Sequence, residues 1–181
     1  IMESTYGDRE HPPFTDMRSR LAQIVKDTAA RGGRVLIPAF AVGRVQELVY
    51  DLHALAREKA IPAIPIYIDS PLAVDATSVF GMHPEVFDRT ESLVTMVQDL
   101  FRFDLVHYTR DAAESKALNM QRGPMIIIAA SGMVEAGRIL HHIANGATDP
   151  RNTILIVGFQ AEHTLGRRNV GRRPMIKVFG D

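Results

Sequence analysis

Two spacings of apolar residues alternate along the chain. Where apolar residues recur every third or fourth position, they predict helices over 17–28, 45–55, 71–80, 112–119 and 133–146. Short runs rich in Ile, Val and Leu predict strands at 34–40, 64–69, 105–109, 124–130, 153–159 and 175–180. Between these, residues 84–102 fit either a helix or an irregular segment.

The predicted strands are nearly continuous apolar runs rather than alternating ones, as in "PMIIIAA" at 124–130. Such runs are typical of strands that are buried on both faces, and these occur in parallel sheets covered by helices. The sequence therefore predicts an α/β fold of the Rossmann-like kind, with a mostly parallel sheet and helices on both faces.

Composition limits the classes of partner. The chain has 181 residues, and its 21 basic and 21 acidic residues balance, so any contact with a polyanion must be local. It has no cysteine, so a metal site would have to use His and carboxylates. No apolar run reaches the roughly 18 residues that a membrane span needs. We expect a cytoplasmic protein with no membrane partner.

Polar, glycine-containing segments follow the predicted strands, namely "AFAVGRVQE", "DSPLA", "ASGMVEAGR" and "FQAEHTLGRR". In a parallel sheet these segments meet at one edge, where ligands bind. A glycine turn that leads into a helix presents free N–H groups and a positive dipole end to an anion. The sequence therefore predicts a phosphate-binding rim at this edge. Neither GxGxxG nor GxxxxGK[ST] is present, which argues against a dinucleotide or P-loop site.

Six motifs give this pattern a family resemblance. "ESTYGDREH", "PAFAVGRVQEL", "IDSPLA", "ESKALN", "AASGMVEAGRILHHI" and "GFQAEHTLGRR" occur in this order. The chain resembles the β-CASP branch of the metallo-β-lactamase superfamily, above all its RNA-processing nucleases. These include the endonuclease subunit of the pre-mRNA 3′ cleavage factor and its bacterial and archaeal relatives. The resemblance implies a hydrolase that cleaves RNA phosphodiester bonds with the help of metal ions.

The resemblance also implies a domain organisation. In the family, the β-CASP domain is inserted into a metallo-β-lactamase domain that holds two zinc ions. By this comparison residues 1–12 are a remnant of the metallo-β-lactamase strand and its motif A loop, 13–170 are the β-CASP domain, and 171–181 lead back. We expect such a fragment to bind no cofactor itself and to be inactive alone. Its expected partners are single-stranded RNA, the missing metallo-β-lactamase domain and, as a further option, a second copy.

Candidate site residues follow from the resemblance and from the predicted rim. Glu3 corresponds to the motif A acid, which orients a catalytic histidine in the longer protein; in this chain alone it would lack its partner. The residues expected to bind RNA phosphates share the rim, and they are Arg44, Ser131, Gly132, Met133, Arg138, Thr164, Arg167 and Arg168. Together with Arg172 and Arg173, the last two make a cluster of guanidinium groups.

Several of these residues have a second interpretation. Arg44 either grips a phosphate or pairs with a neighbouring carboxylate. Ser131 binds phosphate or caps the next helix, and these two roles are compatible. The arginine cluster is either a contact surface or a solvated loop. Asp69 is interpreted as a cap for the helix that follows it, in preference to a catalytic acid.

Four further residues carry smaller expectations. His142, like its neighbour His141, is interpreted as an ordinary surface or half-buried side chain, because adjacent histidines do not share a metal on a helix. Ser115 and Lys116 are expected on a solvated helix face. His163 occupies a position at which the related sequences usually have glycine, so the turn there is either strained or differently shaped.

Two rival functions remain open at this stage. One is a DNA-directed β-CASP nuclease of the repair branch, because contacts to a single-strand backbone do not by themselves discriminate RNA from DNA. The other is a non-catalytic nucleotide-binding or structural Rossmann-like module, which the missing phosphate-loop fingerprints disfavour.

Overall fold

The predicted parallel sheet is present in the computed structural model, which describes residues 2, 5–8, 10, 14–83, 101–171 and 178. Five strands lie in the order β3-β2-β4-β1-β5, and every pair is parallel. Their bounds are β1 Arg34–Pro38, β2 Ile66–Ile68, β3 Val106–Tyr108, β4 Met125–Ala129 and β5 Thr153–Ile154. The predicted α/β, Rossmann-like fold is confirmed.

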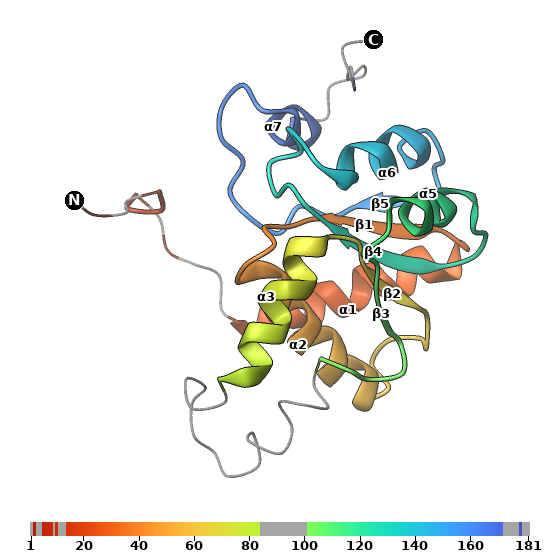
Figure 1. The fold of residues 1–181 in the computed structure, drawn as a ribbon. Coiled ribbons are helices and arrows are strands. Elements are labelled where there is room, and N and C mark those ends of the chain that lie inside the picture. The colour runs from red at the N-terminus through yellow and green to blue at the C-terminus, as the bar shows by residue number, and fades with distance from the viewer. Residues whose placement is uncertain are drawn as a thin grey trace.

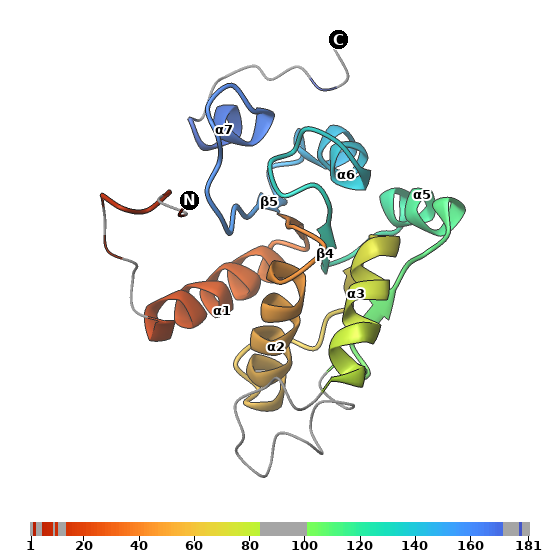
Figure 2. The same cartoon turned by 60° about the vertical axis from the view of Figure 1, so that its left-hand side comes forward.

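Helices cover both faces of this sheet (Figures 1 and 2). On one face lie α1 Phe14–Ala30, α2 Arg44–Arg57 and α3 Pro71–Met82. On the other lie α5 Ala112–Met120, α6 Arg138–Gly146 and α7 Leu165–Val170. The connection after β1 therefore runs over one face and the connection after β4 over the other, although these two strands are neighbours.

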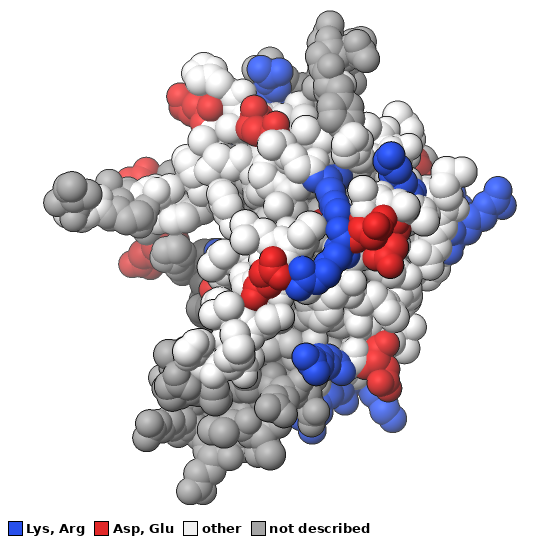
Figure 3. Space-filling view, in the orientation of Figure 1, with Lys and Arg blue, Asp and Glu red and all other residues white. Residues whose placement is uncertain are grey.

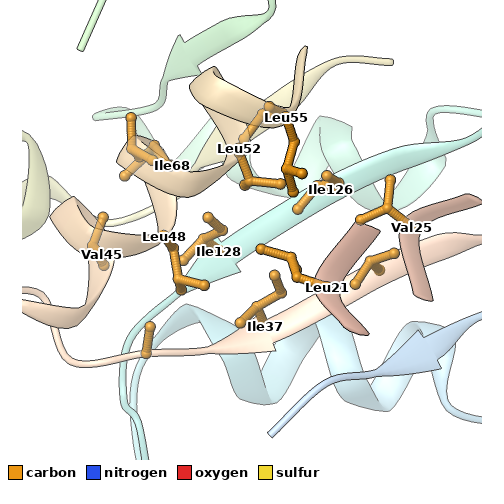
Figure 4. Packing of buried hydrophobic residues seen from close by; sticks show 14 of the residues in the cluster. Leu21, Val25, Ile37, Val45, Leu48, Leu52, Leu55, Ile68, Ile126 and Ile128 are labelled. Carbon is orange, nitrogen blue, oxygen red and sulfur yellow. The ribbon is translucent and has the colours of Figure 1, made fainter. Parts of the chain in front are cut away.

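The larger core lies between the sheet and helices α1 and α2. Alternate residues of each strand point into it, such as Ile126 and Ile128 of β4, and they meet Leu48 and Leu52 of α2 (Figure 4). Each fully buried Ile or Leu side chain contributes about 1.5 to 3 kcal/mol. The intervening strand residues, such as Ile127, pack against α6 on the opposite face. Since both faces are buried, β4 is apolar throughout its length.

Several predicted elements are shorter in the structure, two of them by five residues. The helix predicted over 133–146 begins only at Arg138, because Val134 and Gly137 have φ angles of 61° and 82°, which no right-handed helix accommodates. The strand predicted over 153–159 ends at Ile154. Beyond it, one more N–H, that of Leu155, still donates to Leu36 of β1. The predicted strand at 175–180, Val178 apart, and residues 84–100 lie outside the described residues.

Charges of both signs are mixed on the surface, as Figure 3 shows for one face. Several are paired at hydrogen-bond distance, for example Arg18 with Glu58 at 2.8 Å and Arg110 with Asp75 at 2.6 Å. Within the described ranges, no helix is both long enough and apolar enough to cross a membrane.

Candidate functional site

The carboxyl ends of β1, β4 and β5 bring three connecting segments to one edge of the sheet. These are residues 39–43, 131–137 and 155–164. β1 and β4 are adjacent there, and their connections depart over opposite faces, which is where ligand crevices form in open α/β sheets. The predicted rim therefore lies at a topological switch point.

A pocket of about 330 Å³ opens at this point. Three of the predicted phosphate-binding residues line it together, namely Arg44, Gly132 and Met133. Its other walls include Phe40 after β1 and Phe159 after β5. The structure thus brings together predicted residues that are as far as 89 positions apart in the sequence, Arg44 and Met133.

The turn before α2 is held by the side chain of Gln46. Its Oε1 accepts a hydrogen bond from the Gly43 N–H at 2.8 Å, and its Nε2 donates to the Ala41 carbonyl and to Thr77. Gly43 has a φ of 84°, in the region that favours glycine. This arrangement places Arg44 at the first position of α2, beside the pocket.

Arg44 pairs with Glu47 one turn along the helix, at 2.7 Å. Of the two interpretations of Arg44, the structure contains the ion pair. Both side chains are exposed, and exposed pairs contribute only about 0 to 1 kcal/mol. The pair therefore does not prevent the guanidinium from turning to a phosphate, and that role stays a prediction.

The 131–137 loop is closed by its own hydrogen bonds. The Ser131 hydroxyl accepts from the N–H groups of Glu135 and Ala136 at 3.2 and 3.3 Å. Ser131 therefore caps a turn inside the loop, not α6, whose N-cap is Gly137. From the next loop, Gln160 Nε2 donates to the Gly132 carbonyl at 2.9 Å. These contacts hold the peptide units of Gly132 and Met133 at the pocket wall.

Arg138 does not line this pocket and instead contacts the residues that follow β2 and β3. Its NH1 donates to Asp69 Oδ1 at 2.7 Å and to the Thr109 carbonyl at 3.2 Å, and its NH2 donates to the Arg110 carbonyl at 2.7 Å. Its predicted phosphate contact remains untested, but these bonds already engage both terminal nitrogens of the guanidinium.

Asp69 is the centre of this buried network. Its Oδ2 accepts from Ser115 Oγ at 2.5 Å and lies 2.6 Å from His142 Nε2. Burial raises the pKa of the Asp69 carboxyl, but the hydrogen bonds from His142, Ser115 and Arg138 outweigh it, so the pKa is lowered. Because the carboxylate is fully enclosed and has a partner on each oxygen, it serves as an internal anion that joins β2, α5 and α6.

Three expectations about this network were wrong. Asp69 does not cap α3; Ser70 does, by accepting a bond from the Ala73 N–H. His142 is fully buried rather than superficial, although His141 is exposed as expected. Ser115 is buried against Asp69, whereas Lys116 beside it is exposed. The sequence lacks a local signal for these contacts, because the partners come from different elements.

Thr164 is the N-cap of α7. Its hydroxyl accepts from the Arg167 N–H at 3.1 Å and donates to the Ala161 carbonyl at 2.7 Å. The Leu165 N–H donates to the carboxylate of Glu135, and the Gly166 N–H donates to the Met133 carbonyl at 3.1 Å. The start of α7 is thus bonded to the 131–137 loop by two hydrogen bonds.

Arg167 and Arg168 are exposed and line a second hollow of about 320 Å³ together with His163. His163 has a φ of 69°, which answers the expectation about that turn: it takes the left-handed conformation that glycine favours. Five of the eight predicted phosphate-binding residues therefore line two places, Arg44, Gly132 and Met133 the pocket and Arg167 and Arg168 the hollow. Ser131, Arg138 and Thr164 line neither. Glu3, Arg172 and Arg173 lie outside the described residues.

The sequence interpretation missed the two pocket aromatics, Phe40 and Phe159. Each is the last residue of a predicted strand, Phe40 of 34–40 and Phe159 of 153–159. A usable signal was the position itself, because an aromatic residue at the carboxyl end of a parallel strand borders the ligand crevice.

Metal ligands are not gathered in the part of the chain that the structure describes. Within it, no group of three or more His, Cys, Asp or Glu side chains is placed to hold a metal ion. The Asp69 and His142 side chains are engaged with Arg138, Ser115 and Asn119.

Comparisons with known proteins place this fold and rim in context. The Beta-Casp domain family matches residues 45–168. The chain is 37% identical over 182 residues to ribonuclease TTHA0252 of Thermus thermophilus, covering 100% of this chain and 42% of that protein. It is 38% identical to transcription termination factor FttA of Pyrococcus abyssi, covering 93% of this chain and 26% of that protein. Endoribonuclease ysh1 of Schizosaccharomyces pombe is 32% identical, covering 93% of this chain and 22% of that protein. The chain spans less than half the length of each.

Proposed function

The chain belongs to the β-CASP domain family, and on this premise we propose that it is the RNA-holding domain of a longer, zinc-dependent ribonuclease. In this proposal the domain forms one wall of the cleft in which RNA lies. Residues 13–170 are the domain proper, and the segments on either side connect it to a metallo-β-lactamase domain of the same polypeptide. The cytoplasm is the proposed compartment.

The observation that supports this most is the pocket at the β1–β4 switch point. It joins a cation, Arg44, to the peptide units of Gly132 and Met133 in the pocket wall. Guanidinium and backbone N–H groups are the donors that phosphate oxygens accept. Since relatives in a bacterium and a yeast carry the names ribonuclease and endoribonuclease, the phosphate in question belongs to RNA.

Arg167 and Arg168 supply a second contact point. They lie on α7, which is bonded to the 131–137 loop through Gly166 and Met133. Because the two places are coupled through this bond, a strand of RNA that contacts both is held in a fixed path. The contribution of this chain is therefore to position the backbone of the substrate.

Hydrolysis itself belongs to the rest of the longer protein. The described residues offer no metal-ligand cluster, so no step of the proposal passes through a metal bound by them. Two zinc ions held elsewhere in the longer protein would activate the attacking water and stabilise the developing charge. The 181-residue chain alone is accordingly proposed to be inactive, which metal analysis together with an RNA cleavage assay tests.

Titration decides between RNA and the rival ligands. Labelled single-stranded RNA, DNA of the same sequence and ATP are titrated with the chain. We expect RNA to bind with a Kd on the order of 10⁻⁴ to 10⁻⁶ M at physiological salt, as for non-specific binding, and ATP to bind more weakly. ATP binding tighter than RNA would indicate a nucleotide-binding module, and tighter DNA binding would indicate the repair branch.

A further inference from the structure

We propose that Phe40 and Phe159 form a subsite on which an unpaired RNA base stacks, next to the phosphate contacts at the same pocket. This inference rests on the proposed function and adds to it a contact with the base. It assigns a role to two side chains that the phosphate chemistry leaves unused.

Among the phenylalanines whose side chains the structure describes, only these two rings are exposed. Phe40 is 54% exposed and Phe159 is 38% exposed, whereas Phe101 is 5% exposed in the core. Phe80 and Phe103 pack against the same core. An apolar ring left in water lacks the stabilisation that burial of the side chain gives. Two such rings at one pocket therefore indicate a ligand surface.

Neighbouring residues hold the two rings in place at the pocket. A Cβ atom on Gly132 would lie 2.8 Å from Cδ2 of Phe40, so glycine there lets the ring lie directly against the loop. Phe159 meets the ring of Tyr6 edge to face, with centroids 6.2 Å apart and planes at 83°. This contact restricts the orientation of Phe159. Both rings are therefore supported in place rather than free to collapse into the pocket.

Donors for a phosphate lie beside the rings. Within the described part of the chain, no group accepts a hydrogen bond from the backbone N–H of Gly132 or Met133. The Arg44 guanidinium lies at the same pocket and is held only by an exposed ion pair. Aromatic faces next to cationic and N–H donors are what single-stranded nucleic acid sites combine. The pocket volume of about 330 Å³ is also within the range of small-ligand sites.

The other occupant to consider is an apolar surface of the longer polypeptide. Such a surface would cover the two rings but would leave the N–H groups of Gly132 and Met133 without acceptors. A buried N–H without an acceptor loses its hydrogen bond to water and gains none in return, which is destabilising. A nucleotide satisfies the rings with its base and the donors with its phosphate, so RNA fits the whole pocket better.

Paired probes test the proposal. Fluorescein-labelled oligouridylate and inorganic polyphosphate are titrated with the wild-type chain and with Phe40→Ala and Phe159→Ala. Base stacking contributes about 1 to 3 kcal/mol per base, so each substitution should weaken RNA binding about 5- to 150-fold. Polyphosphate has no base, so its affinity should not change. The salt slope should also be unchanged, because no charge is removed. Circular dichroism checks that each variant is folded.

Met120→Ala is the matched control. Met120 is 83% exposed but lies at the end of α5, before β4 begins and so away from the carboxyl edge. Its substitution should leave both affinities as in the wild type.

A second variant gives a direct signature. The chain has no tryptophan, so Phe40→Trp introduces a single reporter that keeps an aromatic face. We expect RNA binding to be retained and the tryptophan fluorescence to be quenched by oligouridylate but not by polyphosphate. Met120→Trp should show no quenching.

Each result supports or overturns a defined claim. If both alanine variants bind RNA with the affinity of the wild type, and Phe40→Trp shows no quenching, the stacking subsite is overturned. The proposed function would still stand. Equal losses for RNA and polyphosphate would show that the rings only support the loop or cover a protein surface, and this also overturns the subsite. No RNA binding by the wild type overturns both proposals.

Discussion

The carboxylate of Asp69 and the guanidinium of Arg138 are joined by an ion pair of 2.7 Å at the carboxyl edge of the sheet. Asp69 directly follows β2, and Arg138 is the first residue of α6 and ends the 131–137 loop. Through the carbonyls of Thr109 and Arg110, Arg138 also holds the chain that follows β3. One pair therefore fixes three segments at the carboxyl edge of the sheet, including the loop that carries Gly132 and Met133.

Substitution of Asp69 tests that relationship. Asp69→Asn should lower the free energy of unfolding by about 3 to 5 kcal/mol at neutral pH, because it leaves Arg138 without its counter-ion in a buried network. Urea unfolding at pH 7 measures this. Asp104→Asn is the control, since Asp104 is an exposed surface carboxylate whose removal should matter little. Equal stability of Asp69→Asn and wild type would contradict an anchoring role.

The pH dependence of stability has a definite sign at Asp69. Its pKa is lowered in the folded state relative to the ordinary value of 3.8, so its contribution is fully present above about pH 4 and is lost as the pH falls through the folded pKa. Wild-type stability should therefore drop in acid, and Asp69→Asn should show a shallower drop. Parallel curves for the two proteins over this range would show that Asp69 is not the group responsible.

The pKa of the surface carboxyl of Asp149 is also lowered, but for a different reason. Hydrogen bonds from the side chain and backbone of Arg151 lower the pKa of its carboxyl to about 2. NMR titration of the side-chain carboxyl should show a midpoint at about 2, and Arg151→Ala should move it up toward the ordinary value of 3.8. A midpoint that is the same in both proteins would mean that the Arg151 contact is not populated in solution.

His163 should make the folded state less stable than glycine would at the same position. Its φ of 69° is left-handed, which costs a side-chain-bearing residue about 1 to 2 kcal/mol. His163→Gly should raise the stability by about 0.5 to 1 kcal/mol after the added freedom of the unfolded chain is counted. The neighbouring Glu162→Gly, which lacks a positive φ, should lower it. Thermal unfolding should show a higher Tm for His163→Gly and a lower Tm for Glu162→Gly. Changes of the same sign would contradict backbone strain at His163.

Gly166 is required by close packing. A Cβ there would come within 1.6 Å of Gln160 Oε1 and 2.9 Å of the Met133 carbonyl. Although alanine favours helices, Gly166→Ala should destabilise the protein by about 1 to 3 kcal/mol. Gly158→Ala is the matched control, because its Cβ would meet nothing within 4 Å. Urea midpoints that fall equally in both variants would show that the contact does not limit the fold.

Much of the fold was predictable because buried strands carry a purely local signal. The runs of β1 and β4 are apolar at nearly every position, since both faces of the sheet are covered. The Gly-containing segments after them were therefore placed correctly at one edge. The helical spacing of apolar residues gave a wrong prediction at 133–137, where Val134 is apolar and fully buried but takes a φ of 61°. A buried side chain fits a helical pattern whether or not its backbone is helical.

The site was predictable in part for the same reason. Arg44, Gly132 and Met133 meet because they follow adjacent parallel strands, which sequence order and fold class imply. The Asp69 network was not predictable, because its partners Ser115, Arg138 and His142 are 46, 69 and 73 residues away. Such contacts depend on how α5 and α6 pack together, and no local pattern records that.

The salt dependence of RNA binding tests the central claim most directly. Two to four phosphate contacts to a single strand predict a slope of log K against log salt of about −1.4 to −2.8, from about −0.7 per contact. Arg167→Ala combined with Arg168→Ala should weaken RNA binding and flatten that slope by about one unit or more. Arg20→Ala combined with Arg57→Ala, which removes two exposed cations from α1 and α2, should leave it unchanged. Unchanged affinity and slope in the Arg167 and Arg168 double variant would contradict a phosphate-binding rim at α7.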